Sequence, residues 1–336
     1  MDQTIQRNSK SQISFTNIKV VHKYDSLQTP TIYIITATYP RMVQLAELTR
    51  LCHTFLHVKN LHWIVVEDVN VPSDDLGIFL RKCGVPFTLL SERTPPDQVL
   101  PPGQPRWRYP RGVVQRNRGL QWLRDNLKLR LNKGVVYIAD DDNTYSLRLF
   151  DEIRTTKRVS TWPVALAGRL KWEGCVTKPD HSDVIDRMQT IFKPWREFPI
   201  DMAGFAVNLD LILSHPDAKF YADPKFFGML ETNFLKNLGL KNFTELEPKA
   251  DGCTKASLIS FLLDSLLILL NNMLLGNPNT FSEVLAFYSH FNKFPVTVTT
   301  NYAYILVWHT QAKDPDIISL DKLKTSIQNT MLPCDI

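Results

Sequence analysis

Strand-like segments that alternate with helix-like segments are the feature that most constrains the fold of this chain. Residues 31–38 form an apolar, β-branched run, and QLAELTRLCHTFLHV after it has apolar residues at helical spacing. Similar strand patterns occur at residues 61–68, 85–90 and 134–142. Such alternation is typical of a mostly parallel sheet with helices on both faces, in which ligands bind beyond the carboxyl ends of the strands. We therefore predict an α/β fold with its site at that edge.

The later part of the chain mixes element types and indicates a second unit packed on the first. From about Ser146 a helical pattern, SLRLFDEIRTTKR, precedes strand patterns around PVALAGRL and MAGFAVNL. We predict a polar segment over residues 1–29, a first subdomain over 30–145 and a second, smaller subdomain over 146–336.

Composition excludes several classes of protein. With 336 residues, 44% apolar and 22% charged, the chain can bury a core and is not intrinsically disordered. Five cysteines without a C-x-x-C pair indicate neither a zinc site nor a dense disulfide framework. The first thirty residues contain no apolar run that could serve as a signal sequence, so the chain as written is not expected to enter the secretory pathway.

Residues 256–304 differ in composition from the rest of the chain. They contain only three charged side chains and no arginine, and they begin with the apolar run ASLISFLLDSLLILLNNMLLG. This run has the roughly 20 residues that a membrane span needs. Asp264 argues against a span, because a central carboxylate costs roughly 2.5–3.5 kcal/mol on insertion scales. We interpret 256–304 as an atypical insertion in the second subdomain, with a membrane span as the less favoured alternative.

Three adjacent aspartates, Asp140, Asp141 and Asp142, end one of the predicted strands. Neighbouring carboxylates repel one another unless a cation or hydrogen-bond donors neutralise them. Oxygen ligands favour Mn²⁺ or Mg²⁺ over Zn²⁺. A solvated acidic turn is the alternative interpretation, and the position at a strand end favours the metal.

A basic segment over residues 106–133 complements these acids, with nine lysines and arginines and a single acid. RGVVQRNRGLQWLRDNLKLRLNKG within it predicts an amphipathic helix that Arg111 and Arg116 open, and a helix start favours an anion. A carboxylate-held metal together with arginines suits a diphosphate. A solvated basic helix or a nucleic-acid surface are the alternatives, but no nucleic-acid-binding motif appears, so we expect no nucleic-acid partner.

Several segments resemble the β-1,3-glucuronosyltransferases of glycosyltransferase family 43, inverting enzymes that transfer glucuronic acid from UDP-glucuronate to a terminal galactose. In family order they are TATYPRMVQLAELTRL, LHWIVVED, PRGVVQRNRGLQWL, VVYIADDDNTY, FPIDMAGFAVNL, MLETNFL, EPKADGCTK and LVWHT. The resemblance implies a GT-A type glycosyltransferase fold, with a UDP-sugar-binding subdomain over 30–145 and an acceptor-binding subdomain over 146–336. It also implies Mn²⁺ as cofactor and a homodimer.

The resemblance implies a role for individual residues on the donor side. Tyr39 and Asp68 would hold the uracil, Arg116 would face the glucuronate carboxylate, and Asp142 would be the direct Mn²⁺ ligand. The implied donor-binding residues are Tyr39, Asp68, Arg111, Arg116, Asp140, Asp141 and His309.

On the acceptor side, the resemblance implies Glu231 as the catalytic base. Inverting transfer needs one carboxylate to take the proton from the attacking galactose hydroxyl. The implied acceptor-binding residues are Glu173, Arg196, Asp201 and Phe192, the last where the family has a stacking tryptophan.

Three departures from the family pattern qualify these expectations. Gln311 follows LVWHT where the family has an arginine, and the insertion at 256–304 separates CTK from LVWHT. An impaired or non-catalytic UDP-binding isoform is therefore the alternative function. Family members are anchored in the Golgi membrane and face its lumen, whereas the sequence as given is expected to begin in the stem, either because its amino terminus is truncated or because the product is soluble. A lumenal location would make Asn242 of the Asn-Phe-Thr sequon a glycosylation site.

The sequence does not decide which of two galactose-terminated glycans on proteins is the acceptor. The family divides between the Gal-Gal-Xyl linkage region of proteoglycans and the terminal N-acetyllactosamine of glycoproteins. We favour the proteoglycan linkage on family grounds.

Overall fold

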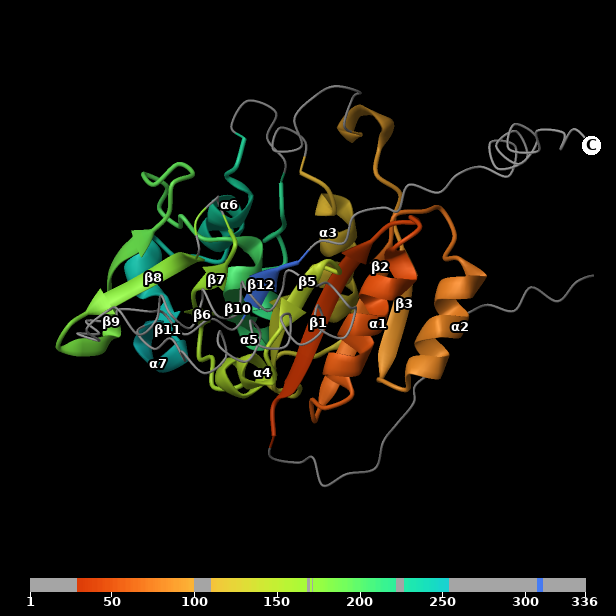
Figure 1. Ribbon diagram of the computed structural model, residues 1–336, viewed down its shortest axis with the longest axis horizontal. Coiled ribbons are helices and arrows are strands. Elements are labelled where there is room, and N and C mark those ends of the chain that lie inside the picture. The colour runs from red at the N-terminus through yellow and green to blue at the C-terminus, as the bar shows by residue number, and fades with distance from the viewer. Residues whose placement is uncertain are drawn as a thin grey trace, which may run out of the picture.

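A seven-stranded sheet forms the centre of the computed structural model, which describes residues 29–99, 110–167, 170, 172–221, 227–253 and 307–310 (Figure 1). In sheet order its strands are β11 (Glu247–Pro248), β6 (Val159–Thr161), β10 (Phe205–Asn208), β4 (Gly134–Ile138), β1 (Thr31–Thr38), β2 (Leu61–Glu67) and β3 (Phe87–Ser91). Strands β4, β1, β2 and β3 run parallel, whereas β10 is antiparallel to both β4 and β6. The predicted mostly parallel α/β fold is confirmed.

Helices cover both faces of this sheet because successive side chains of a strand point to opposite faces. Ile32 and Ile34 of β1 share a buried cluster with Leu48 and Leu51 of helix α1 (Gln44–Phe55). On the other face, Tyr33 and Ile35 share a second cluster with Leu120 and Leu123 of helix α3 (Val113–Asn126). Helix α2 (Asp74–Cys83) connects β2 to β3. The predicted basic helix is therefore present but shorter than predicted, because the backbone becomes extended at Leu127.

A five-stranded sheet lies beside the first and joins segments that are far apart in the sequence. Its order is β5 (Asn143–Tyr145), β12 (Val307–His309), β7 (Val164–Ala165), β8 (Trp172–Lys178) and β9 (His181–Gln189). Strand β12, blue in Figure 1, lies between β5 and β7, antiparallel to the former and parallel to the latter. The hairpin of β8 and β9 was not predicted from the sequence. Besides short 3-10 helices, the described residues also form α4 (Leu147–Ile153), α5 (Leu209–Ser214), α6 (Leu230–Asn237) and the short turn α7 (Ala250–Cys253).

The predicted divisions of the chain stay predictions. Strands β6, β10 and β11 belong to the second predicted subdomain in sequence but complete the main sheet. Residues 1–28 and the insertion at 256–304 lie outside the described residues. Within the described part of the chain, no helix is long and apolar enough to cross a membrane.

Two disulfide bonds link elements that the sequence does not place together. Cys52–Cys83 joins α1 to α2, and Cys175–Cys253 joins β8 to α7. Cysteine spacing alone gives no connectivity, so the sequence analysis did not find these pairs.

The turn α7 is left-handed, with positive φ at each of its residues, Ala250–Cys253. Such backbone costs energy for residues other than glycine. Thr177 Oγ1 donates a hydrogen bond to the Gly252 carbonyl at 2.6 Å, and a Cβ added at Gly252 would collide with the Ser182 carbonyl. The turn is therefore held between the β8–β9 hairpin and the disulfide.

Candidate active site

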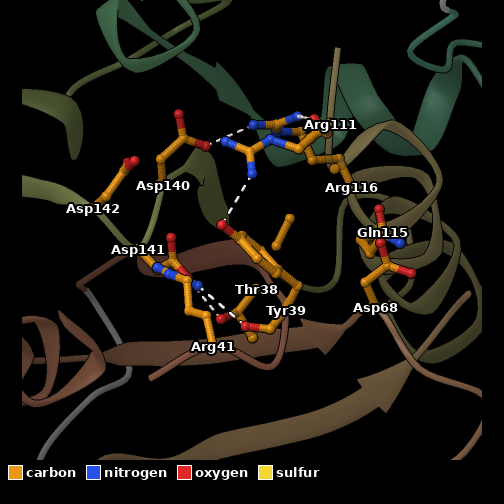
Figure 2. Close-up of a pocket in the computed structure, with 12 residues that line it drawn as sticks. Thr38, Tyr39, Arg41, Asp68, Arg111, Gln115, Arg116, Asp140, Asp141 and Asp142 are labelled. Carbon is orange, nitrogen blue, oxygen red and sulfur yellow. Dashed lines mark hydrogen bonds and ion pairs between the residues drawn. The ribbon is translucent and has the colours of Figure 1, made fainter. Parts of the chain in front are cut away.

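A cavity of about 290 Å³ opens at the carboxyl ends of β1, β2 and β4 (Figure 2), the edge at which the sequence predicted a site. The strands end in polar residues there, so their side chains meet in one place. Most of the predicted donor-side residues line it: Tyr39, Asp68, Arg111, Arg116, Asp140, Asp141 and Asp142.

Tyr39 lies between two arginines on one side of this cavity. Arg111, just before α3, donates a hydrogen bond to the Tyr39 hydroxyl at 3.0 Å. The guanidinium carbons of Arg41 and Arg111 lie 4.6 and 5.1 Å from the centre of the Tyr39 ring, a cation–π geometry. Asp68 is fixed nearby because its carboxylate accepts hydrogen bonds from the Thr94 backbone N–H at 2.7 Å and the Thr94 hydroxyl at 2.6 Å. This end of the cavity offers an aromatic ring and a carboxylate.

Arg116 and Asp140, which both line the cavity, form an ion pair with 2.6 Å between Nη2 and Oδ1. Arg116 also donates to the Arg111 carbonyl at 2.8 Å and is buried. Gly112 between them has φ +77°, and an added Cβ there would lie 2.9 Å from Arg116 Nη1. A glycine at this position therefore lets the chain turn into α3 and leaves room for the guanidinium.

Three carboxylates lie close enough together to hold a cation: oxygens of Glu47, Asp141 and Asp142 are within 4.8 Å of one another. Asp141 accepts a hydrogen bond from Thr38 Oγ1 at 2.6 Å and pairs with Arg41, whereas the Asp142 carboxylate has no hydrogen-bond or ion-pair partner among the described residues. Burial, followed by the charges of Asp140, Asp141 and Glu47, raises the pKa of Asp142 to about 6. An excess of buried negative charge on hard oxygen donors fits a divalent cation of the Mn²⁺ or Mg²⁺ type.

His309 of β12 follows the insertion in the sequence and lies next to the aspartates of the site. Its Nε2 lies 3.2 Å from Asp201 Oδ1, and the Thr310 backbone N–H donates to the Asp142 carbonyl at 3.3 Å. Burial alone would lower the pKa of His309, but the hydrogen bond and charge of Asp201, with Asp140 and Asp142, raise it to about 9. The imidazole is therefore a cation at neutral pH, next to the acidic cluster.

Glu231, in the first turn of α6, has a carboxylate suited to proton transfer. Its side chain is 16% exposed, and Oε2 lies 3.6 Å from Arg196 Nη1. Burial raises the pKa of Glu231 to about 7, although the charge of Arg196 lowers it. A base whose pKa lies near the working pH is efficient in general-base catalysis.

Arg196 connects Glu231 to the loop that carries Phe192. Its guanidinium donates to the Gly228 carbonyl at 2.9 Å and to the Phe192 carbonyl at 3.2 Å, and lies 5.5 Å from the centre of the Phe192 ring. Phe192 and Trp195 are 39% and 68% exposed, so aromatic surface is available beside the carboxylate. The structure brings Phe192, Arg196 and Glu231 together.

The other predicted residues lie in separate contacts. Glu173, buried in β8, accepts a hydrogen bond from the Thr190 hydroxyl. Asn242 is exposed, and its side-chain oxygen accepts hydrogen bonds from the Thr244 backbone N–H at 3.0 Å and the Thr244 hydroxyl at 2.6 Å. The roles predicted for these two residues stay predictions.

Comparison with known proteins decides the family, because the profile of glycosyltransferase family 43 matches residues 51–262. This chain belongs to glycosyltransferase family 43. Galactosylgalactosylxylosylprotein 3-beta-glucuronosyltransferase sqv-8 of Caenorhabditis elegans is 45% identical over 228 residues, which are 68% of this chain and 62% of that protein. Galactosylgalactosylxylosylprotein 3-beta-glucuronosyltransferases 1 and 2 of Homo sapiens are 47% and 48% identical over 67% and 68% of this chain. The same alignments cover 67% and 68% of the two human proteins.

Solved structures resemble the family 43 chain only remotely. Residues 1–349 of TarS from S. aureus are 13% identical with a TM-score of 0.40, covering 65% of this chain and 57% of that one. A mannosyltransferase from Pyrobaculum calidifontis, in complex with GDP-Man and Mn²⁺, is 15% identical with a TM-score of 0.36. The match covers 73% of this chain and 63% of the mannosyltransferase.

The sequence analysis did not single out two residues of the candidate site. Arg41 lies in the segment TATYPRMVQLAELTRL that carried the resemblance, but a single arginine after a strand has no distinctive pattern. Glu47 is an acid on a helix, where carboxylates are usually solvated; here it is buried and faces the aspartates. Only the packing of α1 against the ends of β1 and β4 reveals them.

Proposed function

We propose that this chain is an inverting glucuronosyltransferase that transfers glucuronic acid from UDP-glucuronate to a terminal galactose in β-1,3 linkage. The observation that carries the proposal is one cavity in which Tyr39, Asp68 and Arg111 lie beside the three aspartates. The relatives are named as galactosylgalactosylxylosylprotein 3-beta-glucuronosyltransferases, which supports glucuronate as the transferred sugar and the Gal-Gal-Xyl acceptor.

The chemistry of the donor set supports Mn²⁺ as cofactor. Asp142 would hold the ion, with Glu47 and Asp141 nearby. When bound, Mn²⁺ supplies positive charge that stabilises the leaving diphosphate. Arg111 in the cavity and the His309 cation beside Asp201 would add positive charge, and a preorganised site makes such charge effective. Arg116 would pair with the glucuronate carboxylate, since a guanidinium binds a carboxylate with two parallel hydrogen bonds.

Glu231 would act as general base in the transfer. The galactose oxygen forms a bond to the anomeric carbon of glucuronate while the bond from that carbon to the UDP oxygen breaks on the opposite face. The hydroxyl proton passes to the Glu231 carboxylate, and the electron pair of the broken bond stays with UDP. The exposed ring of Phe192 provides an apolar surface for the acceptor sugar beside this base.

The alternative of an impaired isoform has no support in the described residues. Strand β12, which follows the insertion in the sequence, pairs with β5 and β7, and His309 contacts Asp201.

We also propose a lumenal Golgi location and a homodimer from the family resemblance. The two disulfide bonds support a lumenal location, because disulfides persist in oxidising compartments.

A transfer assay tests the proposal. The chain is incubated with radiolabelled UDP-glucuronate, MnCl₂ and either a Gal-Gal-Xyl or an N-acetyllactosamine acceptor, and the product linkage is determined by NMR. We expect β-1,3-glucuronate on Gal-Gal-Xyl, no transfer from UDP-glucose, and loss of transfer in Glu231→Gln. UDP binding without transfer to either acceptor would contradict the proposed activity.

A further inference from the structure

Arg41, between β1 and α1, makes more contacts in the donor site than its position in the sequence suggests. Its Nη2 lies 2.8 Å from Glu47 Oε2, its Nη1 lies 2.8 Å from Asp141 Oδ2, and the side chain is only 8% exposed. Nη1 also donates to the Tyr39 carbonyl at 3.2 Å, and the guanidinium lies on the Tyr39 ring. One side chain thus contacts both the acidic cluster and the aromatic ring of the cavity (Figure 2).

Arg41 forms ion pairs with two of the three carboxylates, Glu47 and Asp141, and not with Asp142. Thr38 donates a hydrogen bond to Asp141. Asp142 has no comparable partner among the described residues. Neighbouring Arg50 also forms an ion pair with Glu47, at a longer distance of 3.9 Å, and it donates hydrogen bonds to the backbone carbonyls of Asn143 and Asp141 rather than to a second carboxylate.

We infer that Arg41 is a positioning residue of the donor site: it keeps Glu47 and Asp141 from the cation, leaves Asp142 to bind it, and fixes Tyr39 for the nucleotide. This role rests on the proposed binding of UDP and a divalent cation. It assigns opposite effects to one side chain, because its positive charge weakens cation binding while its hydrogen bonds and stacking favour nucleotide binding.

Two binding constants test this role without an activity assay. Mn²⁺ binding to the full chain is measured from MnCl₂ alone by electron paramagnetic resonance of the free ion, and UDP binding at saturating Mn²⁺ by calorimetry. In Arg41→Gln we expect Mn²⁺ to bind at least about tenfold tighter, because a positive charge that repels the cation is removed from beside its carboxylates. We expect UDP to bind at least about tenfold more weakly, because Tyr39 loses the hydrogen bond and the cation–π contact through which Arg41 holds it.

Arg41→Lys separates charge from geometry. It keeps the positive charge but cannot bridge two carboxylates and lie flat on Tyr39. We expect Mn²⁺ binding like that of the wild type and weakened UDP binding. Arg124→Gln is the matched control. Arg124 lies in the last turn of α3, away from the cavity, is partly buried and donates hydrogen bonds to the backbone carbonyls of His215 and Ala218. Both of its binding constants should equal those of the wild type.

Several outcomes would overturn the role. Equal weakening of Mn²⁺ and UDP binding in Arg41→Gln would indicate a merely structural arginine, as would two unchanged constants. If Arg41→Gln does not fold, wild-type UDP affinity in Arg41→Lys overturns the role. Failure of the proposed function can be distinguished from failure of this role. If the wild type transfers no glucuronate but Arg41→Gln shows the expected changes in Mn²⁺ and UDP binding, the role of Arg41 stands and the proposed activity does not. UDP binding by the wild type that needs no Mn²⁺ contradicts the metal dependence and this role together.

Discussion

Replacing Glu231 with glutamine keeps the shape of the side chain and removes only its ability to ionise. We expect the transfer rate to fall by roughly 10²–10⁴, the usual contribution of a general base. UDP affinity should stay unchanged, because Glu231 does not line the donor cavity. The wild-type rate should rise with pH and level off above about 7, where the Glu231 carboxylate is ionised.

The same substitution should change stability in a pH-dependent way. Burial raises the pKa of Glu231 from 4.5 to about 7, so the folded state binds the proton more tightly than the unfolded state. Stability is therefore lost as pH rises between these values, and the full cost above them is roughly 3 kcal/mol. Glutamine does not ionise, so Glu231→Gln should be more stable than the wild type at about pH 8 and similar at about pH 4.

Transfer kinetics across pH and urea unfolding at both pH values measure these effects. Normal turnover in Glu231→Gln would mean that another carboxylate, such as Glu173 or Asp201, takes the proton. A stability difference that does not change with pH would contradict the raised pKa. An intact rate with altered UDP affinity would place Glu231 in donor binding instead.

Two further perturbations test contacts in the structure, and a third tests the interpretation of residues 256–304 from the sequence. Asp142→Ala should abolish Mn²⁺-dependent UDP binding in calorimetry, and undiminished UDP affinity of the wild type in EDTA would remove the metal from the mechanism. Gly252→Ala should lower the free energy of unfolding by roughly 2–3 kcal/mol, because φ is +69° and the added Cβ meets the Ser182 carbonyl. Gly84→Ala, with φ +82° and open space, is the matched control and should cost only about 1 kcal/mol in urea unfolding. Deleting residues 256–304 should give a more soluble protein with equal or higher transfer activity, and loss of UDP binding would show that this block is integral to the fold.

Local pattern in the sequence determined much of the sheet and the composition of the site. The apolar runs that become β1, β2 and β4 are visible as periodicity, and the acids that end β4 follow directly in the chain. Because parallel strands bring their carboxyl ends to one edge, Asp68 and the three aspartates could be placed at a common site. Family motifs then predicted Tyr39, Arg111 and Glu231 as further residues of the site.

The tertiary structure alone decided which of these residues touch. His309 and Asp201 are 108 positions apart, and Thr38 and Asp141 are 103 apart, yet each pair makes a hydrogen bond. Periodicity reports which face of an element is buried, but not which distant element covers it. Which distant elements pack together decides the pairing of β12 with β5 and β7. It also decides the two disulfides and the contacts of Arg41. Packing also determined the electrostatics, because only burial beside particular charges raises the pKa of Glu231 and gives His309 its positive charge.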